Sequence, residues 1–271
     1  MKKPPFEFDI SQYPKLNQYK GLLVVGTDTE VGKTMITGAI ARSLRNQGRT
    51  VDVFKPVASG CHKTPAGIVG EDCEFLAAAS DTPRKLSEVI PIQLKPALAP
   101  NVAAQRSGVE ISLDKIFGAY NALEKPAPGN PPADAVIVEG VGGLLCPISD
   151  EFWLIHFAKL INLPVIVVAR PNLGTINHTL LTVDTLRRHG LDVLGVVINR
   201  YLPDAVDPKS NCDDDGIIAM QNNPAQIEML GDVPVLSIVP DSKKSSVKDA
   251  IICDDVQFAV NTVDWAKLLR V

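Results

Sequence analysis

Short, almost entirely apolar runs recur along the chain and alternate with longer segments whose apolar residues return every three or four positions. The apolar runs predict buried β-strands at 21–25, 51–54, 135–139, 163–169, 191–198 and 233–236. The longer spacing predicts helices at 35–47, 73–79, 111–123, 224–230 and 256–269, and another that opens at 173–177. Strand followed by helix, repeated, predicts a single α/β domain with a mainly parallel sheet and helices on both faces.

The residues before the first strand have a different character. Residues 1–20 start with lysines and prolines and have no apolar h-region, so we interpret them as an N-terminal extension and not as a secretory signal. We expect this extension to pack at its aromatic positions Phe6, Phe8 and Tyr13. The domain itself is predicted to cover residues 21–271, without an internal repeat or a second domain.

Two stretches lack a periodic pattern. Residues 91–109 contain Pro91, Pro96 and Pro100, and we predict no regular element there. Residues 203–216 are rich in turn-forming and acidic residues, which predicts a mobile loop. Its three consecutive aspartates do not match the spacing of an EF-hand calcium loop.

Composition narrows the possible partners. The net charge is −4, from 27 basic and 31 acidic residues, which argues against nucleic acid as the main partner. No apolar run approaches the ~20 residues of a membrane span. The five cysteines form no C-x-x-C pair, so we expect incidental thiols in a reducing, cytoplasmic compartment. A zinc site from Cys61, His62 and Cys73 is the alternative, although these residues lack a tight ligand spacing.

The segment from Gly26 to Thr34 reads Gly-Thr-Asp-Thr-Glu-Val-Gly-Lys-Thr and joins the first strand to the first helix. A strand, a loop and a helix that begins with Gly-Lys-Thr are typical of a phosphate-binding loop. Free N–H groups of the loop and the helix terminus favour an anion there. Lys33 adds charge for the β- and γ-phosphates, and the Thr34 hydroxyl can bind Mg²⁺. Thr27 stands where the strict pattern has glycine, so the loop is a variant.

This loop resembles that of dethiobiotin synthetase, an ATP-dependent carboxylase of biotin synthesis. Similar motifs follow in the family's order at 55–60, 139–143 and 173–178, and the resemblance covers roughly residues 21–240. It implies a P-loop NTPase-like fold, ATP as co-substrate and Mg²⁺ as cofactor. It also implies that 7,8-diaminopelargonic acid and CO₂ are joined into dethiobiotin by a homodimer with its site at the subunit interface.

Several charged residues stand where such a site belongs. Lys55 and Glu139 each end a strand, and ligands bind at the carboxyl edge of open α/β sheets. A solvated strand-end lysine is an equally good explanation for Lys55 from the residues alone. Glu139 is better explained as a metal-organising carboxylate opposite the loop. Asp72 opens a helix, and an acid that interacts with the helix dipole is the simpler explanation there.

The resemblance assigns roles residue by residue. Catalytic roles fall to Thr29, Lys33 and Lys55. ATP contacts fall to Glu30, Val31, Gly32, Lys33, Thr34, Asp72, Glu139, Gly140, Val141, Gly142, Asn199, Pro234, Val235 and Leu236. Mg²⁺ ligation falls to Thr34, Asp72 and Glu139. Substrate contacts fall to Lys55, Ser59, Gly174, Thr175, Ile176 and Asn177, with Pro100 and Asn101 in a substrate loop. The alternative for 174–177 is an ordinary helix start, with His178 and His189 at the surface.

A different class has a similar loop and sheet: MinD- and ParA-like ATPases, which act as nucleotide-gated modules on membranes or DNA. Their loop carries a signature lysine where this chain has Asp28, and two glycines where it has Thr29 and Glu30. The C-terminal segment also lacks the basic amphipathic character of a membrane anchor. These differences favour the carboxylase.

Overall fold

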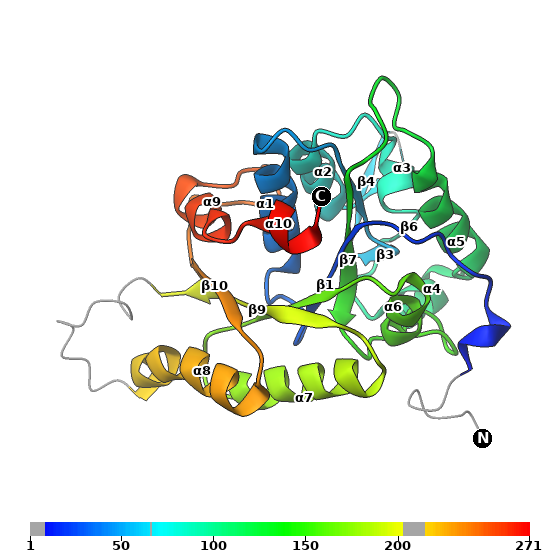
Figure 1. Ribbon diagram of the computed structural model, residues 1–271. Helices are drawn as coiled ribbons and strands as arrows, with labels where there is room; N and C mark the ends of the chain where they lie inside the picture. Colours follow the sequence, from blue (N-terminus) through cyan, green and yellow to red (C-terminus); the bar gives the residue numbers. More distant parts are fainter. Residues whose placement is uncertain (1–8, 66, 203–214) are drawn as a thin grey trace.

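The apolar runs form one six-stranded sheet in the computed structural model, which describes residues 9–65, 67–202 and 215–271 (Figure 1). Its strands are β1 (Gly21–Gly26), β2 (Val51–Phe54), β7 (Ala135–Gly143), β8 (Val165–Ala169), β9 (Val193–Tyr201) and β10 (Val235–Pro240). They are ordered β10-β9-β8-β1-β7-β2, and every neighbouring pair is parallel. Because the strands are parallel, all their carboxyl ends meet at one edge of the sheet.

Helices cover both faces of this sheet. They are α1 (Lys33–Asn46), α2 (Glu71–Ser80), α3 (Leu86–Val89), α4 (Pro100–Ser107), α5 (Leu113–Asn121), α6 (Leu154–Ile161), α7 (Thr175–Arg188), α8 (Asp215–Gly231), α9 (Asp254–Asn261) and α10 (Trp265–Leu269). Figure 1 shows α7 and α8 below the sheet and α1, α9 and α10 above it. The predicted α/β architecture with a parallel sheet is therefore confirmed.

The alternation of side chains along β1 explains why there are two cores. Leu23 and Val25 belong to the core that α4 to α8 cover, whereas Leu22 and Val24 belong to the core beneath α1, α2, α9 and α10. All four side chains are fully buried. Successive residues of a strand point to opposite faces, so a strand covered on both faces must be apolar at every position.

Smaller elements complete the chain. Two short parallel strands, β3 (Val57–Ser59) and β6 (Ile92–Leu94), pair beside the main sheet, and β4 (His62–Thr64) and β5 (Gly67–Val69) form an antiparallel hairpin. Two 3-10 turns, η1 (Ile10–Gln12) and η2 (Ala122–Glu124), lie in the connections. Among the described residues, no helix has the length and apolar character needed to cross a membrane.

The prediction of no regular element at 91–109 is wrong. The segment contains β6 and the eight-residue helix α4. Pro100 is the first residue of α4, where proline's missing N–H has no intrahelical role, and Gly108 ends the helix in a left-handed conformation with φ 65°. Pro100 therefore starts a helix, whereas the prediction took the prolines of this segment as a sign that it contains no helix or strand.

The C-terminal helix predicted at 256–269 is two helices. After α9, the Asp264 side chain accepts a hydrogen bond from the backbone N–H of Lys267 and caps α10. Other elements extend beyond their predicted ends. β7 continues past Glu139 to Gly143, so Glu139 lies within the strand and does not end it, and β10 continues to Pro240. β9 extends to Tyr201, and α8 begins at Asp215 and includes Pro224. Most of the acidic loop predicted at 203–216 lies outside the described residues.

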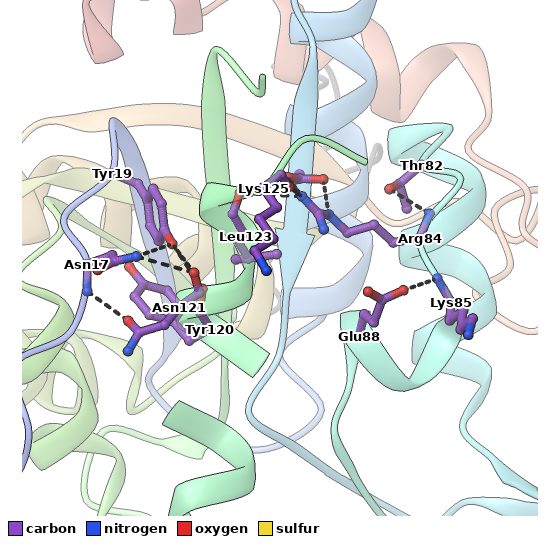
Figure 2. Close-up of polar contacts among 11 residues, drawn as sticks. Asn17, Tyr19, Thr82, Arg84, Lys85, Glu88, Tyr120, Asn121, Leu123 and Lys125 are labelled. Atoms are coloured by element: carbon purple, nitrogen blue, oxygen red, sulfur yellow. Dashed lines mark hydrogen bonds and ion pairs between the residues drawn. The ribbon is translucent and has the colours of Figure 1, made fainter. Parts of the chain in front are cut away.

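The N-terminal extension contacts the core where the structure describes it. The Tyr13 ring makes edge contacts with Phe117 and Phe152. The Tyr19 hydroxyl donates to the backbone carbonyls of Tyr120 and Asn121, at the end of α5 (Figure 2). These contacts bear out packing at Tyr13, while Phe6 and Phe8 lie outside the described residues.

The connection between α2 and α3 is fastened to the edge of the sheet by Arg84 (Figure 2). Its guanidinium makes two hydrogen bonds to the Asp52 carboxylate on β2, at 2.8 and 2.7 Å, and both side chains are buried. It also donates to the carbonyl of Lys125 at 2.6 Å. A satisfied buried ion pair of this kind fixes β2 against the segment that follows α2.

Candidate active site

The loop between β1 and α1 has the backbone that a phosphate site requires. Gly32 has φ 88°, and a Cβ there would lie 2.0 Å from Nδ2 of Asn199. Nδ2 of Asn199 also donates to the carbonyl of Val31 at 2.9 Å. β9 therefore braces the loop closely, and glycine is required at position 32.

Lys33 begins α1 and is largely buried, with 6% of its surface exposed. Its Nζ donates to the backbone carbonyl of Asp28 at 3.0 Å, so the side chain folds back over the loop. Burial lowers the pKa of Lys33 to about 8, partly opposed by the Glu139 carboxylate. An anion bound in the loop would favour the charged form of this lysine.

Three charged residues from three elements meet opposite the loop. Nζ of Lys55, directly after β2, lies 2.9 Å from Oε1 of Glu139 on β7 and makes a second ion pair with Oδ2 of Asp72 on α2. The same Glu139 oxygen accepts from the Thr34 hydroxyl at 2.8 Å. The explanation of Lys55 as a solvated strand-end lysine is therefore wrong: it is 5% exposed and paired with two carboxylates.

The electrostatics of this cluster follow from its burial. Burial alone would lower the pKa of Lys55, but the Glu139 and Asp72 carboxylates outweigh burial and raise that pKa. Burial raises the pKa of Glu139, although Lys55 opposes this. For Asp72 the ammonium outweighs burial, and the pKa is lowered. Lys55 is thus held as a cation and is unsuited to act as a proton acceptor.

The donor set fits a magnesium ion. Oε2 of Glu139 is buried and has no hydrogen-bond partner among the described residues. A hydroxyl from Thr34 and carboxylates from Asp72 and Glu139 are the hard oxygen ligands that Mg²⁺ prefers. Within the described part of the chain, no three His, Cys, Asp or Glu side chains gather as a metal cluster, so the zinc alternative gains no support.

These groups line one cleft of about 980 Å³ at the carboxyl edge of the sheet. Most of the residues predicted from the sequence border it: Thr29, Glu30, Gly32, Lys33, Thr34, Lys55, Ser59, Asp72, Pro100, Glu139, Val141, Gly142 and Asn199. Val31 is 2% exposed and Gly140 is a buried residue of β7, and neither of them lines the cleft. Asn101 instead donates to Asp150 outside the lining.

The structure does not bring Pro234, Val235 or Leu236 to the cleft. Val235 begins β10, whereas Pro240 ends it, and it is Pro240, Asp241 and Ser242 that line the cleft. The two ends of a six-residue strand lie about 17 Å apart. The predicted adenine contacts were placed at the wrong end of this strand, because a parallel strand presents its carboxyl end to the site.

Gly174, Thr175, Ile176 and Asn177 form the first turn of α7, as predicted, but they do not line the cleft of their own chain. Gly174 has φ 90° and provides no side-chain cap, which leaves the N–H groups of this helix end without a capping side chain. Any substrate contact from this turn would have to reach a second chain.

Some residues that line the cleft were not predicted from the sequence. Arg200 and Lys248 add basic groups, and Ser245 and Ser246 add hydroxyls. The sequence signal that could have identified Arg200 is its position directly after Asn199, which was predicted to contact ATP. The loop that holds Ser245 to Lys248 has no periodic pattern and is placed by the end of β10.

Comparison with known proteins connects this site to a family. Residues 20–248 match the family model described as AAA domain. A protein of Bacillus cereus strain G9842, "ATP-dependent dethiobiotin synthetase BioD", is 37% identical over 233 residues, covering 86% of this chain and 88% of that protein. The protein of the same name from Bacillus cereus strain ATCC 14579 is 39% identical over 221 residues, covering 81% of this chain and 83% of that protein.

Solved structures resemble the fold. The MinD cell division protein of Aquifex aeolicus has a TM-score of 0.55 and 12% identity, covering 93% of this chain and 95% of that one. A chain of the MinC:MinD cell division protein complex of the same organism has a TM-score of 0.53 and 12% identity, with 93% of this chain and 94% of that chain covered. Identity this low shows a shared P-loop architecture and says nothing about function.

Proposed function

The chain belongs to the ATP-dependent dethiobiotin synthetase family, and on that premise we propose that the cleft beside its phosphate-binding loop is where the reaction occurs. As a member of this family it is an enzyme that forms dethiobiotin, in biotin biosynthesis, with ATP as co-substrate. Its substrates in this proposal are 7,8-diaminopelargonic acid and CO₂, and its products are dethiobiotin, ADP and phosphate.

The proposed chemistry has three steps. One amine of the diamine bonds to the carbon of CO₂ and releases a proton, which gives an anionic carbamate. A carbamate oxygen bonds to the γ-phosphorus of ATP while the bond from that phosphorus to the β-phosphate oxygen breaks, so that ADP leaves with the electron pair and a carbamic-phosphoric anhydride remains. The second amine then attacks the carbamate carbon and closes the cyclic urea, while phosphate departs with the electron pair of the broken C–O bond.

The observation that supports this best is the placement of Lys55. A lysine that stays charged between Glu139 and Asp72, in the same cleft as Lys33, can hold an anionic carbamate against the phosphate loop. Positioning is the main contribution here, since alignment of two bound reactants replaces an encounter in solution. Thr29 and Ser59 line the same cleft and add hydroxyl groups that can bond to the carbamate.

Thr34, Asp72 and Glu139 would hold Mg²⁺ in this site. The ion, when bound, supplies positive charge that offsets the charge of the transferring phosphoryl group. Lys33 supplies the matching charge from the loop side. The Asn199 amide, which is buried and braces the loop, reaches the cleft where the nucleotide would lie.

The proposal includes a homodimer. The first turn of α7 lies outside its own cleft, and Leu173 beside it is 81% exposed. Leu181 on the same helix is 58% exposed. A second copy placed over this helix would cover the apolar side chains and let Gly174 to Asn177 bind the substrate carboxylate at the partner's cleft.

We also propose a reducing, cytoplasmic setting, supported by the four described cysteines Cys61, Cys73, Cys146 and Cys253, which are all free. No observation favours a MinD-like switch over the carboxylase. The similarity to MinD structures concerns the fold, and the signature lysine position of that class is Asp28 here.

Replacing Lys55 with methionine tests the proposal at its best-supported residue. Wild-type protein should form dethiobiotin, detected by mass spectrometry, from the diamine, bicarbonate and ATP. Lys55→Met should lower kcat/KM for the diamine on the order of a hundredfold, the usual cost of a lost charge in an active site, while the KM for ATP changes little.

Lys63→Met, a change of an exposed lysine on β4, serves as the control and should behave as wild type. Absence of dethiobiotin from the wild-type reaction would refute the proposed function. A folded Lys55→Met variant with unchanged kcat/KM for the diamine would remove Lys55 from the carbamate site.

A further inference from the structure

Arg200 lies at the mouth of the cleft, beside the phosphate-binding loop. It lines the cleft and follows Asn199 on β9. Its Nε lies 3.9 Å from the point that a Cβ on Gly32 would occupy. Since Gly32 directly precedes Lys33, the guanidinium borders the backbone that would surround a bound phosphate chain.

The backbone turns this side chain toward solvent. Arg200 has φ 61°, a left-handed conformation that costs free energy for a residue with a side chain. The pairing of β10 with β9 is also irregular where Pro240 meets Tyr201. As a result Arg200 is exposed, although its neighbours Asn199 and Tyr201 are buried.

Arg200 also differs from Lys33 and Lys55, the two lysines that line the cleft beside the phosphate-binding loop, because no other group of the described chain holds its guanidinium. Lys33 donates to a loop carbonyl, and Lys55 is paired with two carboxylates. Among the described residues, the Arg200 guanidinium has neither a hydrogen bond nor an ion pair. A strained, unpaired cation at the edge of an anion site is available for the ligand itself.

We propose that Arg200 binds the α- and β-phosphates of the nucleotide, from its place beside Gly32 of the phosphate-binding loop. The inference rests on the proposed function, because it takes ATP as the ligand of this cleft. The planar guanidinium suits two phosphate oxygens at once, and this geometry complements Lys33, which reaches the β- and γ-phosphates. Arg200 thereby acts on nucleotide affinity and has no part in carbamate chemistry.

The variant Arg200→Gly separates this role from a structural one. Glycine removes the side chain and also relieves the left-handed strain, so the melting temperature should stay the same or rise. Binding of Mg·ADP, measured by calorimetry without diamine or bicarbonate, should weaken about tenfold. Affinity for adenosine, measured in the same way, should not change, because adenosine has no phosphate. The Mg·ADP affinity of Arg200→Lys should lie between those of wild type and Arg200→Gly, since lysine keeps the positive charge but lacks the planar guanidinium that bonds to two phosphate oxygens at once.

Arg270→Gly is the control, because this arginine is also exposed and left-handed, with φ 57°, and does not line the cleft. Equal Mg·ADP affinity in Arg200→Gly and wild type would overturn the role of Arg200 and leave the proposed function intact. Equal weakening for adenosine and Mg·ADP would overturn the phosphate contact in favour of a base contact. A wild-type protein that does not bind Mg·ADP would refute the proposed function as well.

Discussion

Lys33→Met is expected to leave the fold intact and reduce turnover on the order of a hundredfold or more, because it removes a charge aimed at the transferring phosphoryl group. Methionine keeps most of the length and the apolar stem of this 6% exposed side chain, so packing at the start of α1 should survive. The hydrogen bond from Nζ to the Asp28 carbonyl is lost, but that carbonyl belongs to a loop that borders the cleft and can bind water.

The measurement is steady-state ADP release, with the melting temperature as the check on folding. Lys159→Met is a matched control, since Lys159 is a partly buried lysine that donates to the carbonyl of His189, remote from the cleft. The control should retain wild-type activity. Wild-type turnover in a folded Lys33→Met variant would show that the loop does not act on the phosphate.

The second large effect is expected from Glu139→Gln. The substitution keeps the shape of a fully buried side chain and removes its charge. It also leaves Lys55 with Asp72 as its remaining carboxylate partner. We expect the rate at saturating ATP to fall on the order of a hundredfold and the Mg²⁺ concentration for half-maximal rate to rise on the order of tenfold.

A titration of initial rate against Mg²⁺ at fixed ATP measures both effects. Asp72→Asn should shift the titration in the same direction by a smaller amount, since Asp72 is less buried than Glu139. Glu71→Gln is the matched control, because Glu71 is adjacent to Asp72 and lines the cleft without a predicted metal role. If the curves of Glu139→Gln and Asp72→Asn both overlay that of wild type, neither carboxylate binds the metal.

The parts of the fold that were predictable are those where local pattern and burial agree. A parallel strand covered on both faces must be apolar throughout, which made 135–139 and 163–169 recognisable. The same logic brought Lys55 and Glu139 to one edge of the sheet, because Lys55 directly follows such a run and Glu139 is the last residue of one. The structure then adds what the pattern lacks: these two side chains are in contact, at 2.9 Å.

The failures have physical causes of a different kind. Pro100 was read as a break because proline disfavours helix interiors, yet the same residue is well suited to a first turn. Pro234 to Leu236 were placed at the wrong end of β10, since strand direction is a property of the sheet and not of the run itself. Asp72 carries a first-turn signature for which a dipole role was the simpler explanation, and its contact with Lys55 and its place in the lining show that it faces the cleft.

The central claim is that the nucleophile in this cleft is the substrate carbamate and not water. Phosphate release should be followed with ATP and Mg²⁺ present while the diamine and bicarbonate are each omitted in turn from degassed buffer. The account predicts slow release until both are present, because the carbamate does not form without them, and then one phosphate for each dethiobiotin formed. Rapid phosphate release without the diamine, or without CO₂, would contradict the account.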